Sequence, residues 1–227
     1  ELGFPPAMVM VAKYMGRGEY LEKDAEGAWL LLIKTLKTDH AAAKIRAALE
    51  FLPGGVGPEN PKRTKKVLQG LINEGNSAAM ISYAMKVLDL QKAEIGSDNS
   101  KKGITLLERA ALEGKDSQAA IYLSLLFNQG NVVPRDQKKA ITFAQLAIDA
   151  GVIRAYGTMG QIFQNQNDME SAVQWFQKGA EKGDEAHSAS VVGDTIGDPF
   201  KGYKWAIPKY PDQVNEHRER GHSRAAD

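Results

Sequence analysis

The sequence lacks cysteine altogether, although it runs to 227 residues. Disulfides, thiolate metal sites and a cysteine nucleophile are therefore excluded. The absence fits a reducing cytosol, and it fits an oxidising periplasm equally well if packing alone stabilises the fold. Histidine is scarce too, and two of the four histidines, His217 and His222, lie five residues apart in a polar stretch. That spacing does not place them on one helical face, so no zinc site is predicted.

Long apolar runs and a strong excess of charge are also missing. No stretch is apolar over the length needed to span a bilayer, so we expect no transmembrane segment. The net charge is +1 at pH 7, which gives the chain no global attraction for nucleic acid or for an acidic membrane. With 43% hydrophobic residues, the chain has ample apolar material for one folded unit.

The motifs that would carry catalysis or nucleotide binding are incomplete. Residues 75–79 (GNSAA) resemble a nucleophile elbow but lack its final glycine. Residues 53–57 (PGGVG) lack the Gly-Lys-Ser/Thr ending of a phosphate-binding loop. Trp29, Trp175 and Trp205 lie at helical spacing from apolar neighbours or in the C-terminal region, which favours packing over a ligand site. The sequence thus predicts no catalytic residue, no metal site and no cofactor, and we expect a protein that is not an enzyme.

The clearest pattern that is present is a repeat in residues 117–151 and 152–184. The matched pairs are Ala119 and Ala155, Leu123 and Met159, Ser124 and Gly160, Phe127 and Phe163, Ala140 and Ala172, Phe143 and Trp175, and Gly151 and Gly183. Self-similarity at a period of about 30–40 residues is typical of repeat solenoids. The repeat therefore decides the predicted fold class.

Each repeat has a direct physical interpretation as a pair of helices. Apolar residues recur every three or four positions on two stretches of 117–151, which predicts two helices. Asp136 precedes the second stretch as a start signal, and Gly151 follows it as a C-terminal glycine. Small residues such as Ser124 and Gly160 let neighbouring helices approach closely, and Gly160 is predicted at a contact with no room for a side chain. Such a pair cannot bury its apolar face alone and must stack on its neighbours.

Looser copies of the pattern extend it to residues 3–39, 40–76 and 77–116, the last with a loop about three residues longer than that of 117–151. After Gly183 the pattern decays into a degenerate C-terminal cap, 185–205, and a polar tail, 206–227. The chain begins at a repeat seam, so we expect a further repeat or a signal segment upstream. The predicted fold is all-α: one domain, 1–227, forming a right-handed α-solenoid (α/α superhelix) of about five to six antiparallel helix-pair repeats.

These segments resemble the Sel-one-like repeat (SLR) family, a relative of the tetratricopeptide repeats. The family pattern, A-x-x-x-L-G-x-x-Y-x-x-G-x-G-V-x-x-D-x-x-x-A-x-x-W-Y-x-x-A-A-x-x-G, appears as AAIYLSLLFNQGNVVPRDQKKAITFAQLAIDAG and as AYGTMGQIFQNQNDMESAVQWFQKGAEKG. The second of these lacks the glycine–valine loop. Some bacterial members carry a disulfide in each repeat, and this chain is not of that branch. The resemblance implies an α-solenoid that binds other proteins.

The functions that follow from the resemblance are expectations of different breadth. The broadest is a non-enzymatic protein–protein interaction scaffold or adaptor that binds a protein or peptide along the concave face of the solenoid. Narrower alternatives are a bacterial immunity protein that inhibits a secreted toxic effector, and a regulatory subunit of an envelope-associated enzyme complex. A purely structural spacer is a further alternative. Many bacterial members are periplasmic or secreted, while a cytoplasmic location stays open, and a monomer is the default oligomeric state.

One stripe of the predicted first helices is the candidate partner-binding surface. It points away from the core stripe, toward the inner face if the solenoid curves like its relatives. Its residues are Val9, Lys13, Arg17, Ile45, Leu49, Ile81, Met85, Leu88, Ile121, Leu125, Asn128, Gln161, Gln164 and Asn165. The middle of the stripe is apolar where a solvated face would be polar, and an apolar patch rimmed by polar groups indicates a partner site. The alternative is that tight curvature buries these residues against neighbouring helices.

Within this stripe we expect different roles for the middle and the ends. Ile81 and Met85 lie near the middle and are the predicted hot spots, because buried central anchors carry most binding energy. Lys13 and Arg17 would meet acidic groups at one end. Gln161, Gln164 and Asn165 would offer hydrogen bonds at the other.

Overall fold

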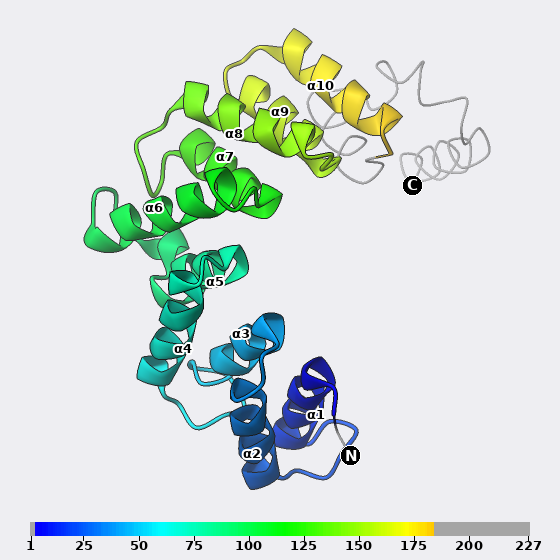
Figure 1. Ribbon diagram of the computed structural model, residues 1–227. Helices are drawn as coiled ribbons and strands as arrows, with labels where there is room; N and C mark the ends of the chain where they lie inside the picture. The colour runs from blue at the N-terminus through cyan, green and yellow to red at the C-terminus, as the bar shows by residue number, and fades with distance from the viewer. Residues whose placement is uncertain (1–2, 184–227) are drawn as a thin grey trace, which may run out of the picture. The chain divides into compact units, whose positions relative to one another are not determined.

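The computed structural model describes residues 3–183, and every regular element within that range is helical (Figure 1). The α-helices are α1 (Pro5–Arg17), α2 (Ala25–Leu36), α3 (Ala41–Leu49), α4 (Pro61–Asn73), α5 (Ser77–Ser82), α6 (Asp98–Leu112), α7 (Ser117–Gln129), α8 (Gln137–Asp149), α9 (Arg154–Gln164) and α10 (Met169–Glu181). A π-helical turn, η1 (Tyr83–Val87), and a 3₁₀ turn, η2 (Leu90–Lys92), follow α5. The predicted all-α fold is confirmed.

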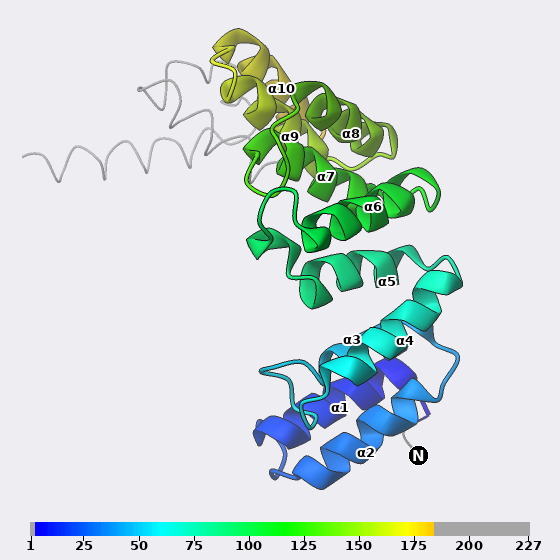
Figure 2. The ribbon, with the colours of Figure 1, turned by 90° about the vertical axis from the view of Figure 1, so that its left-hand side faces the viewer.

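The chain divides by its internal contacts into two compact units, Glu1–Gly151 and Val152–Asp227, and each is described by itself. Within the first unit every α-helix packs on its successor, from α1 on α2 through to α7 on α8 (Figures 1 and 2). The first helices of successive pairs also touch, since α1 contacts α3 and α3 contacts α5. The sequential packing expected of a repeat protein is therefore present.

Polar caps set where the second helix of each pair begins. The N-cap residues are Asp24 for α2, Asn60 for α4, Ser97 for α6, Asp136 for α8 and Asp168 for α10. Each side chain accepts a hydrogen bond from a backbone N–H of the first turn, as Asp136 does from Lys139 at 3.0 Å. At the other end of α8, Gly151 adopts a left-handed conformation with φ +80°. Residues with a side chain rarely adopt this conformation, so glycine is favoured here. The predicted limits of α8 are thus confirmed.

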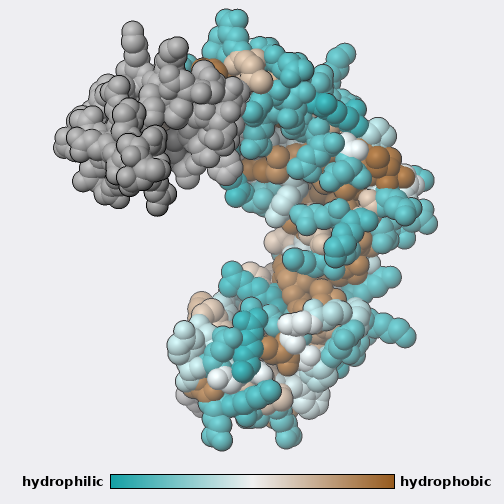
Figure 3. All heavy atoms as spheres, turned by 180° about the vertical axis from the view of Figure 1, so that it is seen from behind, coloured by the Kyte–Doolittle hydropathy of each residue, from teal (hydrophilic) through white to brown (hydrophobic). Residues whose placement is uncertain are grey.

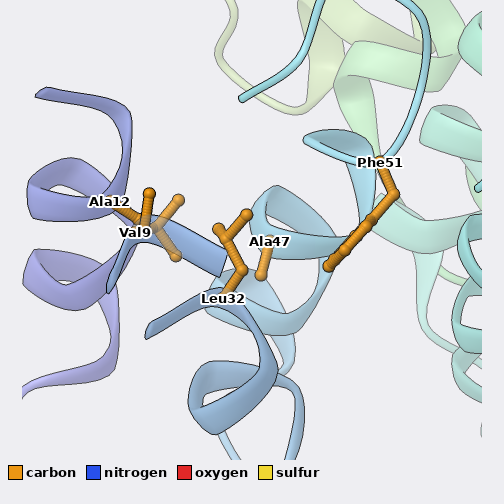
Figure 4. Close-up of a cluster of buried hydrophobic side chains, with 6 residues drawn as sticks. Val9, Ala12, Leu32, Ala47 and Phe51 are labelled. Carbon is orange, nitrogen blue, oxygen red and sulfur yellow. The ribbon is translucent and has the colours of Figure 1, made fainter. Parts of the chain in front are cut away.

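The core of the first two helix pairs is built from small and aliphatic side chains (Figure 4). Val9 and Ala12 of α1 meet Leu32 of α2, and Ala47 of α3 and the ring of Phe51 complete the cluster. Four of these five side chains have no exposed surface, and Val9 keeps only 3%. Because alanine adds almost no bulk, the helix backbones can approach closely enough for Phe51 to fill the remaining space.

Buried hydroxyl groups connect successive elements of the first unit. Ser124 Oγ donates to the carbonyl of Ala140 at 2.9 Å, joining α7 to α8. Thr64 Oγ1 makes the corresponding bond from α4 to Ala48 O at 2.6 Å. Each hydroxyl is fully buried, and each is satisfied by a carbonyl of the neighbouring helix. Ser124 therefore lies at a close helix–helix contact, as its small size predicted.

The first helix of the third pair departs from the regular helix that the sequence predicts. It is helical only from Ser77 to Ser82, and the chain then widens into the π turn η1, where Leu88 N–H donates to Tyr83 O at 3.0 Å. Leu90, in η2, turns back into the core and is fully buried. It occupies the space beside Gly103, where an added Cβ would lie 2.7 Å from Leu90 Cδ1. The long loop of this pair is thus used to place a core side chain.

The second unit contains one described helix pair, α9 and α10, which pack against each other. Gly160 of α9 faces the ring of Phe176 of α10, and an added Cβ at Gly160 would lie 2.5 Å from Phe176 Cε1. The prediction that Gly160 lies at a helix–helix contact without room for a side chain is confirmed. Trp175 lies beside Tyr156, with ring centroids 6.1 Å apart, and therefore packs as expected.

Two further expectations have a different outcome. Trp29 was expected to pack, but it is 36% exposed on α2, because Ala28 and Leu32 occupy the face of that helix that meets the core. The predicted cap, 185–205, the polar tail, 206–227, and Trp205 with them lie outside the described residues.

Candidate partner-binding surface

The candidate stripe runs through the first helices, and the structure divides its members by burial. Ile45 on α3 is 6% exposed, and Ile121 and Asn128 on α7 are 5% and 4% exposed. Val9 on α1 belongs to the core cluster. These four side chains fill contacts within the chain's own fold and offer a partner almost no surface.

The other apolar members of the stripe are half-buried. They are Leu49 on α3, Ile81 on α5, Met85 in η1, Leu88 just after η1, and Leu125 on α7. Figure 3 shows hydrophobic atoms reaching the surface near the middle of the first unit, among polar atoms. A half-buried aliphatic side chain is held in place by its own fold and still exposes apolar area, which suits an anchor for a partner.

The π turn lies within this half-buried set. Tyr83 and Ala84, inside η1, are buried, while Met85 beside them is not. Single π turns in α-helices occur frequently at functional sites, because the widened turn redirects the side chains that follow it. The turn therefore changes the directions of Met85 and Leu88 relative to a regular helix. Sequence reasoning missed it, since a change of hydrogen-bond partner by one residue has no compositional signature.

The basic end of the stripe is already engaged by nearby carboxylates. Lys13 Nζ lies 3.2 Å from Glu50 Oε1, which joins α1 to the residue after α3. Glu50 Oε2 also accepts a hydrogen bond from Val56 N at 3.2 Å, so this carboxylate helps to fix the 53–60 loop. Arg17 lies 4.0 Å from Glu19, and its side chain is 46% exposed. Of the two cations, Arg17 is the more available to a partner.

The polar end of the stripe lies in the second unit, on or next to α9. Gln161 and Gln164 are half-buried, and Asn165, the C-cap residue of α9, is exposed. The structure therefore places these three amides at a surface of their own unit. It does not place them relative to the apolar residues of the first unit.

A cavity that sequence reasoning did not predict lies where α6 ends, α7 begins and α8 ends. Its volume is about 340 Å³, and its apolar walls come from Ala111, Leu112, Leu146 and Ala150. Asp116 also lines it, but that carboxylate caps α7 by accepting from Gln118 N at 2.9 Å and from Ala119 N at 3.2 Å. Its carboxylate is thus engaged in beginning α7. Leu112, which lines the cavity, is 61% exposed, a property that the sequence does not show.

Within the described residues the helices offer neither a metal-ligating cluster nor a membrane-spanning segment. Among residues 3–183, no cluster of three or more histidine, aspartate or glutamate side chains is arranged to hold a metal ion. No helix in the same range has the length and apolar character needed to cross a membrane.

One carboxyl group has a clearly shifted titration. The backbone N–H of Ser171, and then its side chain, hydrogen-bond to Asp168 and hold the pKa of that carboxyl below its ordinary value. The backbone bond is 3.0 Å long and belongs to the N-cap of α10. The shift therefore reports a structural role, because the bonded form is the charged form.

The fold has counterparts among solved structures. A Sel1 repeat protein from Oxalobacter formigenes superposes with a TM-score of 0.63 at 19% identity, covering 100% of this chain and 89% of that one. A protective antigen of uropathogenic Escherichia coli strains, which displays an SLR fold, gives a TM-score of 0.58 at 20% identity, covering 87% of this chain and 42% of that one. No curated protein matches the sequence. At these identities the likeness shows the fold alone, which is the α-solenoid predicted from the repeats.

The family follows from the sequence. The sequence model of the Sel1 repeat matches residues 5–35, 94–115, 117–152 and 153–184, which together make up more than half of the chain. The last two ranges coincide closely with the repeat found in 117–151 and 152–184. The chain therefore belongs to the Sel1 repeat family.

Proposed function

We propose that this protein is a non-enzymatic scaffold that binds a protein partner across the first helices of its first unit. Sel1 repeat proteins are generally protein–protein interaction scaffolds, which supplies the class of function. The observation that carries the specific proposal is the set of half-buried apolar side chains on the first helices and in or just after the π turn: Leu49, Ile81, Met85, Leu88 and Leu125.

Within the stripe, the half-buried residues are the proposed contact points for a partner. Ile45 and Ile121 are buried and offer a partner almost no area, so the half-buried residues form the surface that a partner meets. A partner that covers Ile81 and Met85 removes their remaining apolar area from water, which stabilises the complex by about 25 cal/mol for each Å² covered. Arg17, whose side chain is 46% exposed on α1, would then tune specificity and association rate.

The test begins by identifying the partner and then measures binding directly. A pull-down from the native host with the full chain identifies the partner, and calorimetry with the two purified proteins gives the affinity. The double variant Ile81→Asp, Met85→Asp should abolish binding, because it places two charges in an apolar contact. The matched control is Leu30→Asp, Leu112→Asp, which changes two exposed leucines on second helices at 55% and 61% exposure. This control should bind as the unchanged chain does.

Two outcomes would contradict the proposed surface. If both double variants lose affinity equally, or if both retain it, the partner does not bind to the first helices. The narrower roles differ in the partner itself. An immunity protein should abolish the toxicity of its partner, whereas a regulatory subunit should change the turnover of a partner enzyme. A partner that shows neither effect leaves the adaptor role.

A further inference from the structure

Three consecutive second helices carry a basic pair at the same position of the repeat. The sequence of residues 101–105 is KKGIT, and that of residues 138–142 is KKAIT. The corresponding pair in α4 is Lys62 and Arg63, followed by Thr64. The residue after each pair, Thr64, Gly103 or Ala140, is buried, so the three pairs share a register that the packing of the helices fixes.

In α4 and α8 the position of the pair is unfavourable for the helix itself. Lys62 and Lys138 are each two residues beyond an N-cap, in the first turn, where the helix dipole favours negative charge. The equivalent residues in α2 and α10 are Glu26 and Glu170, both acidic. Glu26 and Glu170 therefore have the charge that a first turn prefers, and Lys62 and Lys138 have the opposite charge. In α6 the first turn holds Asp98, and Lys101 lies four residues beyond the N-cap.

In α4 and α8 the second member of the pair has a contact that explains its presence, whereas Lys102, the second member in α6, is exposed and forms no ion pair among residues 3–183. Arg63 lies over the ring of Phe51 at 5.1 Å, and Lys139 lies over the ring of Phe127 at 4.8 Å. Lys139 also lies 3.8 Å from Glu108 on α6. These residues cover the aromatic ring at the end of the preceding first helix and stabilise the fold.

The first members have no such contact. Lys62, Lys101 and Lys138 are exposed, and within residues 3–183 no carboxylate forms an ion pair with them. We call these three residues the lysine ladder. Nothing in the packing of residues 3–183 requires their charge.

The ladder follows one side of the first unit. In Figure 2, α4, α6 and α8 follow one another with their N-terminal ends on the same side of the unit. The N-terminal turn of α6 is tied to the loop before α8 by the bond from Ser100 Oγ to Val132 O, 2.7 Å long. Residues 59–66 contain four basic and one acidic side chain, residues 135–139 three and one, and residues 94–102 two and two. This side of the unit therefore carries a net positive charge at the start of α4 and of α8, and no net charge at the start of α6. The whole chain has a net charge of only +1.

We propose that the lysine ladder binds an acidic, extended segment of a protein partner. A linear series of single ammonium groups, one for each repeat, complements carboxylates spaced along a chain. Among residues 3–183 none of the large exposed aromatic side chains, Phe4, Tyr20 and Trp29, belongs to the stretches that carry the ladder, so the stacking platform used for single-stranded nucleic acid is missing there. A bilayer surface would require an apolar face beside the charges, and Ile95 is the one large apolar side chain exposed there.

The test uses a fluorescent oligoglutamate peptide as the probe and the full chain as the receptor. Fluorescence anisotropy at low and at high salt should show binding that weakens as salt rises, because screening reduces attraction between exposed charges. The triple variant Lys62→Glu, Lys101→Glu, Lys138→Glu should weaken binding by about tenfold or more. The control is Lys34→Glu, Lys37→Glu, Lys44→Glu, which changes the net charge equally near the end of α2 and the start of α3, outside the three helices that carry the ladder. This control should keep an affinity within about twofold of the unchanged chain.

Further measurements separate the ladder from the other possibilities. Thermal melting should show that the triple variant still folds, since acidic residues in a first turn favour the helix. The variant Ile81→Ser, Met85→Ser should bind oligoglutamate normally, so failure of the apolar surface and failure of the ladder are distinguishable. Equal weakening in both triple variants would overturn the proposal by showing only net charge. Tighter ladder-dependent binding to a DNA duplex, or to vesicles containing phosphatidylserine, would overturn it in favour of those partners.

Discussion

Gly160 of α9 packs directly against the ring of Phe176 of α10, and that ring occupies the place where a side chain at position 160 would begin. Phe176 itself is 1% exposed and forms a buried cluster with Ala172 in the second unit. The glycine is therefore required by the aromatic ring, and the two residues form one packing element.

Leucine at position 160 should overpack this contact. We expect Gly160→Leu to lower the free energy of unfolding by about 1–3 kcal/mol, measured by denaturant titration. Gly70 in α4 is the matched control, because it is exposed and an added Cβ there meets nothing within 4 Å. Gly70→Ala should raise the free energy of unfolding by about 0.5–1 kcal/mol, since alanine favours the helix. An unchanged stability of Gly160→Leu would contradict the described contact.

The contact between Leu90 and Gly103 predicts that the effect of Gly103→Ala on stability depends on the residue at position 90. Leu90→Ala should cost about 2–5 kcal/mol, because it leaves a cavity beside α6. Gly103→Ala should destabilise the unchanged chain, since the new Cβ would lie 2.7 Å from Leu90 Cδ1. In the Leu90→Ala background the same change should instead be neutral or stabilising. A double-mutant cycle that gives additive values would refute this coupling.

The buried hydroxyl of Thr64 should contribute measurably to stability. Thr64→Val keeps the shape of the side chain and removes the bond of 2.6 Å to Ala48 O, so we expect a loss of about 1 kcal/mol. Thr105→Val serves as the control, because the Thr105 hydroxyl is exposed and bonds only to Lys101 O in its own helix. Chemical denaturation of both variants provides the measurement. Equal effects would show that burial of the hydroxyl has no importance.

The lowered pKa of Asp168 predicts a dependence of stability on pH. Because the folded state holds this pKa below the unfolded value, the carboxylate contributes stability that is fully present above roughly pH 4. That contribution should be lost as the pH falls through the folded pKa. Asp168→Asn should lower stability at neutral pH and reduce the additional loss in acid, followed by thermal melting across the pH range. An identical acid profile in the variant would show that another group is responsible.

The parts of the fold that the sequence predicts are those set by local chemistry. Asp136 and Gly151 limit α8 as expected, because capping and a positive φ depend on residues within one turn. Gly160 was predictable because its repeat partner, Ser124, is also small. The π turn at Tyr83–Val87 was not, since it arises from the packing of a whole helix and leaves no signature in composition.

The sequence predicts which residues form the candidate stripe, but it does not predict which of them are exposed enough to contact a partner. Ile45 and Ile81 are the same residue type at comparable positions, yet Ile45 is buried and Ile81 is half-buried. The difference depends on which neighbouring helices reach across each residue, and that is a property of tertiary packing. The lysine ladder shows the reverse case. Its residues are plain in the sequence, but their importance appears only once the contacts of Arg63 and Lys139 are known.

The packing of each helix on its successor has a consequence for how the first unit folds. Its native contacts join segments that are near neighbours along the chain, so little loop entropy is lost before contacts form. Low contact order of this kind is associated with folding in milliseconds or less. Since each pair is stabilised mainly by its neighbours, opening of one pair does not require the whole unit to unfold. Amide hydrogen exchange should therefore reveal a series of separate opening free energies along the chain, one for each helix pair.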